Sequence, residues 1–184
     1  MAAIVAAAWA RARSEGLGAL SLRALAADVG MRQPSLYEYF ESKHGLYDAM
    51  FADGNRQLLG RLDAIELPRQ PRAAVKAFAH AFADFVLEDD ARGQLLFQRP
   101  IPAFVPSPES YTHAERVIER CVGLLAAAGV TDPGDVDCFV AMMAGLIDAQ
   151  ASNDPGGDRW IRHLDRMIDL HLDHARRRTR GTPG

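Results

Sequence analysis

The segment spanning residues 21–43, SLRALAADVGMRQPSLYEYFESK, constrains the fold of this chain more than any other. Its pattern predicts two short helices joined by a tight turn. Ser21 is a residue type that caps helix N-termini well. The apolar residues after it recur at helical spacing: Leu22, Leu25, Ala26 and Val29. Gly30 follows this run, at the place where a glycine commonly ends a helix.

A second helix is predicted over residues 33–40. Pro34 suits its first turn, where the missing N–H would have no partner within the helix. Leu36 and Phe40 lie four positions apart and are expected to point inward. A small residue, a glycine four positions later and an aliphatic residue six positions after that have the spacing of a helix-turn-helix, here Ala26, Gly30 and Leu36.

The second helix is expected to turn a polar set outward: Gln33, Ser35, Tyr37 and Tyr39, flanked by Arg23 and Lys43. Glutamine can bind adenine through two hydrogen bonds, and basic side chains bind phosphate. Such a surface fits the major groove of DNA. The alternative is an ordinary solvated amphipathic helix. Two phenol groups and a glutamine directed outward from so short a helix favour the DNA-binding interpretation.

Residues 4–51 resemble the N-terminal domain of the TetR family of bacterial transcriptional repressors. The matching features are the first helix with Trp9, the corner at Gly16 and Gly18, and the motifs S-L-R-x-L-A, V-G, Q-P-S-L-Y-x-Y-F, x-S-K and L-Y-D-A. The resemblance implies an all-helical homodimer. It also implies a small molecule that binds the C-terminal domain and releases double-stranded operator DNA.

Carried over by position, the resemblance implies that Arg23 contacts phosphate or base and that Lys43 holds phosphate. It places five residues on the groove face: Gln33, Pro34, Ser35, Tyr37 and Tyr39. Two positions depart from the family pattern. Tyr39 stands where many members have histidine, and the carboxylate of Glu38 repels phosphate unless it accepts from a cytosine amino group.

The net charge of the chain does not indicate DNA binding, so the positions of its charged residues matter more than their sum. The chain has 184 residues and a net charge of −3, and its first 50 residues hold five basic and five acidic side chains. DNA binding is therefore expected to depend on where the basic groups lie. No long uncharged apolar run or signal peptide is evident, which predicts a cytoplasmic protein that does not associate with membranes. Cys121 and Cys138 are predicted to be small buried hydrophobic residues.

The remaining chain predicts an all-α protein of about nine helices, with a long fourth helix, residues 42–65, that belongs to two cores. Residues 1–45 are predicted to form the DNA-binding domain, residues 46–178 the ligand-binding and dimerisation domain, and residues 179–184 a disordered tail. We expect His80 to be a hydrogen-bonded core residue. Phe104 and Val105, in a proline-rich segment, are expected to tuck inward.

The last two helices, each with an apolar stripe, predict an antiparallel pair that forms a four-helix bundle with a second copy. Such a dimer would place two recognition helices roughly 34–36 Å apart on a palindromic operator. An effector site is predicted among helices four to eight. Its candidates, any of which can instead be ordinary core, are Phe82, Phe85, Phe97, Phe104, Tyr111, Met142 and Met143. Their aromatic and thioether character favours a hydrophobic or aromatic effector, and no cofactor is predicted.

Two alternatives stay open. The first is a DNA-binding dimer without a small-molecule effector. The second is a metal-dependent enzyme, because His171 and His174 are neighbours on one helix face with Asp173, Asp169 and His163 near them. A solvated face explains these residues better, and no nucleophile triad or phosphate-binding loop appears. We therefore predict no catalytic residues, no metal site and no enzymatic activity.

Overall fold

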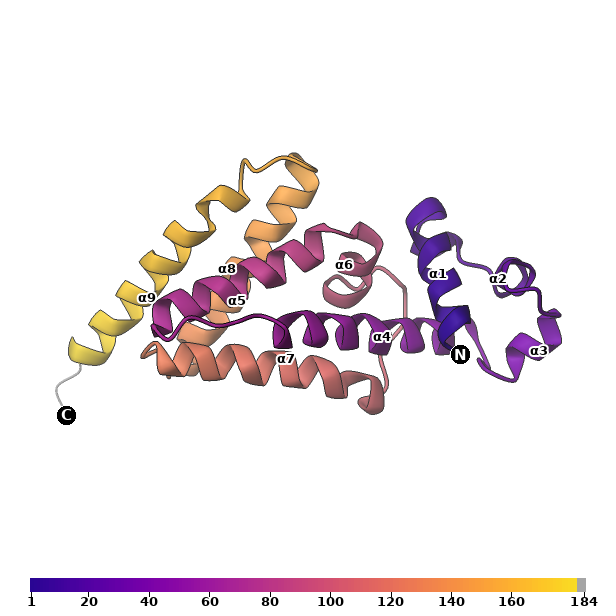
Figure 1. The fold of residues 1–184 in the computed structure, drawn as a ribbon, viewed down its shortest axis with the longest axis horizontal. Helices are drawn as coiled ribbons and strands as arrows, with labels where there is room; N and C mark the ends of the chain where they lie inside the picture. Colours follow the sequence, from indigo (N-terminus) through magenta and orange to yellow (C-terminus); the bar gives the residue numbers. More distant parts are fainter. Residues whose placement is uncertain (182–184) are drawn as a thin grey trace. The chain divides into compact units, whose positions relative to one another are not determined.

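The computed structural model describes residues 1–181, which contain nine α-helices, two short 3-10 helices and no strand (Figure 1). The predicted all-α class is confirmed. The chain divides into two compact units. Unit 1 comprises residues 1–59 and 88–115, and unit 2 comprises residues 60–87 and the chain from 116 onward. The functional domain boundaries given above stay a prediction.

The helix bounds follow the predicted pattern closely. Unit 1 begins with α1 (Ala2–Glu15), η1 (Leu17–Ala19), α2 (Leu22–Asp28) and α3 (Gln33–Tyr37). The others are α4 (Lys43–Asp63), α5 (Pro71–Leu87), α6 (Asp90–Phe97), α7 (Pro108–Ala127), α8 (Pro133–Asn153), η2 (Ile161–His163) and α9 (Leu164–Gly181). Of the predicted tail, residues 182–184 lie outside the described residues.

Side-chain caps and glycines set the helix ends, as the sequence predicts. The Ser21 hydroxyl accepts a hydrogen bond from the Ala24 N–H, and the Asp132 carboxylate accepts one from the Asp135 N–H at 3.1 Å. Gly129 follows the C-terminal end of α7 and adopts φ 88°, a left-handed conformation that glycine reaches without steric cost.

The core of unit 1 joins α1, α2, α3 and the first half of α4 with α6. Trp9 is 3% exposed, and its indole N–H donates to the Asp53 carboxylate at 3.0 Å. Trp9 thus anchors α1 in the core of unit 1. The other large members of this cluster are Leu25, Leu36, Phe40, Leu46, Tyr47, Met50 and Leu95. Burying each such side chain stabilises the unit by about 1.5–3 kcal/mol.

Residues 88–115 pack within unit 1, around the helix-turn-helix domain. The Asp89 carboxylate caps α6 through the Arg92 N–H at 3.1 Å and accepts from Arg13 Nε of α1 at 2.7 Å. Phe104 packs against the core, with its ring centroid 5.8 Å from that of Tyr47. The prediction for Val105 was wrong, since it is 79% exposed. The prolines around it leave the segment extended, so successive side chains need not face the same way.

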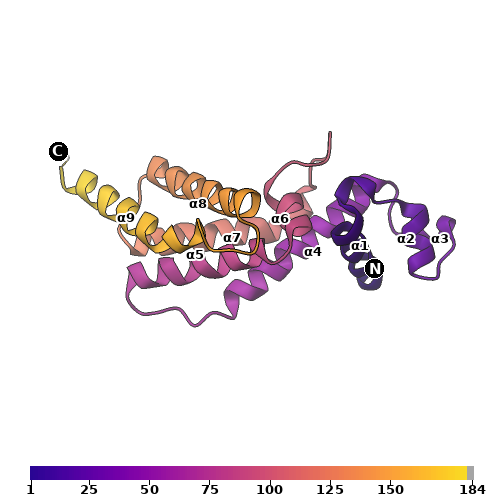
Figure 2. The same ribbon diagram turned by 90° about the horizontal axis from the view of Figure 1, so that it is seen from above.

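Unit 2 is built on α5, α8 and α9, which pack pairwise against one another (Figure 2). Its largest buried side chains include Phe85, Leu125, Phe139, Leu164, Ile168 and Leu172. The chain turns at Asp154, which follows the end of α8.

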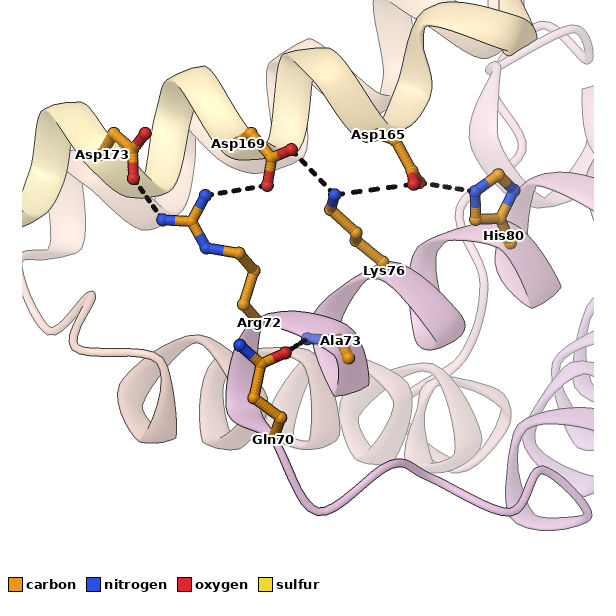
Figure 3. Close-up of polar contacts among 8 residues, drawn as sticks. All are labelled: Gln70, Arg72, Ala73, Lys76, His80, Asp165, Asp169 and Asp173. Atoms are coloured by element: carbon orange, nitrogen blue, oxygen red, sulfur yellow. Dashed lines mark hydrogen bonds and ion pairs between the residues drawn. The ribbon is translucent and has the colours of Figure 1, made fainter.

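A charged ladder lines the contact between α5 and α9 (Figure 3). Arg72 donates to Asp169 at 2.8 Å and also to Asp173, and Lys76 donates to Asp169 at 2.8 Å. His80 Nε2 lies 2.8 Å from the Asp165 carboxylate. The four-residue spacing on both helices brings these groups opposite one another.

Two burial predictions for unit 2 were wrong. His80 is hydrogen-bonded as predicted, but its side chain is 48% exposed, because it joins the ladder at the surface and not the core. Cys121 is buried, which raises the pKa of its thiol to about 11, whereas Cys138 is exposed on α8. Among the described residues, no helix has the length and apolar character that a bilayer crossing requires.

Candidate nucleic-acid interface

A tight turn fixes the geometry between α2 and α3. Gly30 adopts φ 67°, and the Met31 N–H donates to the Ala26 carbonyl at 2.8 Å, which closes the end of α2. Ala26 is 1% exposed, so its small side chain lies at the contact between the two helices. The predicted place of Gly30 at the end of the first helix is confirmed.

The second helix of the motif, α3, is a single short element, Gln33–Tyr37. The predicted helix over residues 33–40 was too long, since a turn follows Tyr37. The Tyr39 and Phe40 N–H groups both donate to the Leu36 carbonyl at 3.0 Å. Leu36 is fully buried and Phe40 is 3% exposed, so both side chains anchor α3 in the core as predicted.

The predicted groove residues lie at the surface on or next to α3. Tyr37 and Tyr39 are 45% and 46% exposed. Gln33 and Pro34 are exposed at the start of the helix, and Ser35 is half-buried. Together they form a polar and aromatic surface that covers the buried side chains of Leu36 and Phe40. Their roles in DNA binding stay a prediction.

Lys43 begins α4 and is held in place. Its ammonium donates to the Gly18 carbonyl at 2.8 Å and lies 5.6 Å from the centroid of the Tyr47 ring. An ammonium group has three N–H donors, so Lys43 can keep the Gly18 bond and still bind a phosphate oxygen. The predicted phosphate contact is therefore compatible with its position.

Arg11 of α1 neutralises two acidic groups of this domain. Its guanidinium donates to Asp28 at 2.8 and 2.9 Å and to Glu15 at 2.6 Å. The hydrogen bond from Arg11 holds the pKa of the Asp28 carboxyl below its usual value. The arrangement reduces the negative field around the end of α2, where phosphate would be repelled.

The predicted effector residues divide between the two units. Phe97, Phe104 and Tyr111 belong to unit 1, where Tyr111 lies 5.2 Å from Phe51, centroid to centroid. The others belong to unit 2: Phe82, Phe85, Met142 and Met143. Within unit 2, the rings of Phe78 and Phe82 stack at 6.4 Å.

The candidate metal ligands do not form a site. No group of three or more ligand side chains close enough to hold a metal occurs within the part of the chain that the structure describes. Asp169 and Asp173 are engaged by Arg72, and the His171 ring lies 5.6 Å from Phe139. Burial lowers the pKa of His171.

The helices and their surface define a class, an all-α protein with an N-terminal helix-turn-helix. Residues 4–50 match the model of a family described as bacterial regulatory proteins, tetR family. Residues 4–50 therefore form a domain of this family, and the resemblance seen in the sequence is confirmed for that segment.

A curated relative is the HTH-type transcriptional regulator Mb1846 of Mycobacterium bovis, 29% identical over 128 residues. The match covers 66% of this chain and 53% of the relative, so the chain spans about half the length of the curated relatives it matches. The matched family is described as one of regulatory proteins, and this relative is named a transcriptional regulator.

Three solved structures share the fold. A protein of unknown function from Rhodococcus sp. RHA1 is similar with a TM-score of 0.76 and 21% identity, over 94% of this chain and 93% of that chain. BioQ with its double-stranded DNA operator has a TM-score of 0.69 and 18% identity, over 94% and 97%. A TetR variant from Acinetobacter baumannii AYE in complex with minocycline has a TM-score of 0.66 and 21% identity, over 96% of each chain.

Proposed function

We propose that this protein is a cytoplasmic DNA-binding transcriptional regulator, most simply a homodimeric repressor that a small hydrophobic or aromatic effector releases from a palindromic operator. The observation that carries the proposal is the exposed surface of Gln33 and Tyr37 on α3 and Tyr39 just after it, held in place by buried Leu36. A recognition helix needs buried apolar residues that hold it in place and polar side chains that reach the edges of the nucleobases. The operator complex of the similar BioQ supports it.

The DNA-binding part of the proposal is tested by gel shift with the DNA upstream of the protein's own gene and of the neighbouring gene. We expect a specific complex that survives moderate salt and excess unrelated DNA. Affinity that is equal for all duplexes, or that vanishes at moderate salt, would overturn the proposal.

The dimer is proposed to form through α8 and α9, which leave hydrophobic side chains uncovered. Val140 on α8 is 42% exposed and Leu170 on α9 is 59% exposed. A self-complementary twofold face of this kind buries such residues. We expect Val140→Asp to convert the dimer to a monomer in analytical ultracentrifugation. The matched control is Ile118→Asp on α7, where an isoleucine is 52% exposed outside the proposed face. Equal behaviour of the two variants would contradict the interface.

The effector site is proposed to use the aromatic and thioether residues of unit 2, among them Phe82 and Met142. The minocycline complex of the similar TetR variant supports a small-molecule effector. A thermal-shift screen of hydrophobic, aromatic and highly charged compounds tests the chemistry. We expect stabilisation by the first two classes and loss of DNA binding with the same compounds. Stabilisation by highly charged compounds alone would contradict an apolar site. If no compound acts on DNA binding, the dimer without a small-molecule effector is the better description.

A further inference from the structure

The basic residues of the first 50 positions are not equally available to DNA. Arg11 is bound to Asp28 and Glu15, Arg13 Nε donates to Asp89 at 2.7 Å, and Lys43 donates to the Gly18 carbonyl. Lys43 keeps donors for a phosphate, whereas Arg23 and Arg32 are exposed and have all of their donors available. Neither side chain makes a hydrogen bond or ion pair with another described residue. Arg23 is already assigned to the interface, and Arg32 is not.

The acidic residue that precedes Arg32 most closely in the sequence, Asp28, is bound to another guanidinium. Both carboxylate oxygens of Asp28 accept from the Arg11 guanidinium, Oδ2 at 2.8 Å and Oδ1 at 2.9 Å. A carboxylate bound in this way has less attraction to offer a second guanidinium. With Asp28 bound in this way and no hydrogen bond or ion pair of its own to a described residue, the Arg32 guanidinium is available to a partner outside the domain.

The backbone places Arg32 beside the base-reading surface. It is the residue before α3, with extended dihedral angles of φ −77° and ψ 144°. Its carbonyl accepts from the Ser35 N–H at 3.0 Å, which fixes it to the first turn of the helix. The side chains that follow it, Gln33 and Pro34, are exposed. In a helix-turn-helix, residues at this end of the recognition helix approach the base edges.

We propose that Arg32 reads a guanine in the major groove of each half-site, next to the base pair contacted by Gln33. This inference rests on the proposed function of α3 as a recognition helix. The planar guanidinium can donate two parallel hydrogen bonds to guanine O6 and N7, which is the commonest specific protein–DNA contact. Arg32 is thus a residue that determines operator specificity and adds to the predicted set. The sequence carried the signal, a basic residue directly before Gln33.

The test is selection of bound duplexes from a randomised library by the wild-type protein, Arg32→Ala, Arg32→Lys and Gln33→Ala, followed by affinity measurements on single base-pair variants. We expect the wild-type motif to contain one guanine in each half-site whose replacement weakens binding roughly 5- to 150-fold. In Arg32→Ala that preference disappears while the other positions keep theirs. Arg32→Lys retains affinity better than it retains the guanine preference, because lysine lacks the fork geometry.

The possible results separate this inference from the function on which it rests. If the wild-type protein selects a motif and Arg32→Ala weakens binding to all sequences alike, Arg32 contacts phosphate and the inference is wrong. An unchanged motif and affinity also overturn it. If the wild-type protein selects no motif at all, the proposed function fails as well. Because the Arg32 side chain is exposed and makes no hydrogen bond or ion pair with the described residues, its variants are expected to melt like the wild type.

Discussion

The Asp48 carboxylate on α4 accepts two hydrogen bonds from Ser107, one from the backbone N–H at 2.7 Å and one from the hydroxyl at 2.8 Å. The Ser110 hydroxyl donates to the same carboxylate at 2.8 Å. A side chain five residues after the start of α4 therefore fixes the start of α7, within unit 1. The sequence separation of 59 residues shows that only folding brings the two together.

Asp48→Ala is expected to lower the free energy of unfolding by about 2–3 kcal/mol, because it leaves partly buried Ser107 and Ser110 donors without their charged acceptor. Chemical denaturation followed by circular dichroism measures the change. Asp84→Ala, at an exposed aspartate of α5, is the control and is expected to stay within about 0.5 kcal/mol of the wild type. A similar, small effect of both substitutions would contradict the role of Asp48.

The charged ladder between α5 and α9 predicts that stability falls both in acid and at high pH. The hydrogen bond from Lys76, followed by that from Arg72, lowers the pKa of Asp169. The same bond raises the pKa of Lys76. The contribution of Asp169 to the free energy of unfolding is therefore complete above its pKa in the unfolded chain, about 4. It is lost as pH falls through its lower pKa in the folded protein. The contribution of Lys76 to the free energy of unfolding is complete below about pH 10.4. It is lost as pH rises through its higher pKa in the folded protein.

Lys76→Met is expected to cost up to about 1 kcal/mol at pH 7 in low salt, since solvent screens these half-exposed groups. The difference from the wild type should shrink in acid and in high salt. Thermal melts from pH 3 to pH 8 provide the measurement. Arg69→Met, at an exposed arginine outside the ladder, is the control. A difference that does not change with pH or salt would show that the ladder contributes packing and not charge.

Gln33→Ala and Lys43→Ala are expected to weaken DNA binding in different ways. Loss of a base contact reduces specificity at one base pair by about 1–3 kcal/mol, whereas loss of a phosphate contact weakens binding to all sequences alike. If each subunit meets about four phosphates, the logarithmic salt slope of the wild-type dimer is about −7. Lys43→Ala makes it shallower by about one for each contact removed. Fluorescence anisotropy at several salt concentrations tests this, and equal losses on all sequences for both variants would refute the assignments.

The two cysteines are expected to react at different rates. Burial raises the pKa of Cys121 to about 11, so its thiolate fraction at pH 8 is roughly a few hundredfold below that of an unperturbed thiol. In the Val140→Asp variant, where the proposed dimer face is open, Cys138 is predicted to react first with an alkylating reagent. Mass spectrometry of the modified peptides measures both rates. Removal of the fast phase by Cys138→Ser is the control, and equally fast modification of Cys121 would contradict its burial.

Local chemistry explains why much of unit 1 could be predicted. Ser21, Gly30 and Pro34 act through their own backbone and caps, so their roles in starting and ending helices do not depend on distant residues. The spacing of Leu36 behind Ala26 follows from helix geometry as well. By contrast, the exposure of Val105 and His80 depends on which partners lie next to them, and these predictions failed.

The sequence by itself determined the all-α class, the helix-turn-helix and the ends of most helices, because periodicity and capping are properties of neighbouring residues. Only the tertiary structure decided that Arg11 neutralises Asp28, that Lys43 is held by Gly18 and that α6 packs with the helix-turn-helix domain. Each of these contacts joins residues that lie far apart in the chain. A pattern read along one segment specifies which side chains are available for such contacts, but the packing of the whole unit selects the partner.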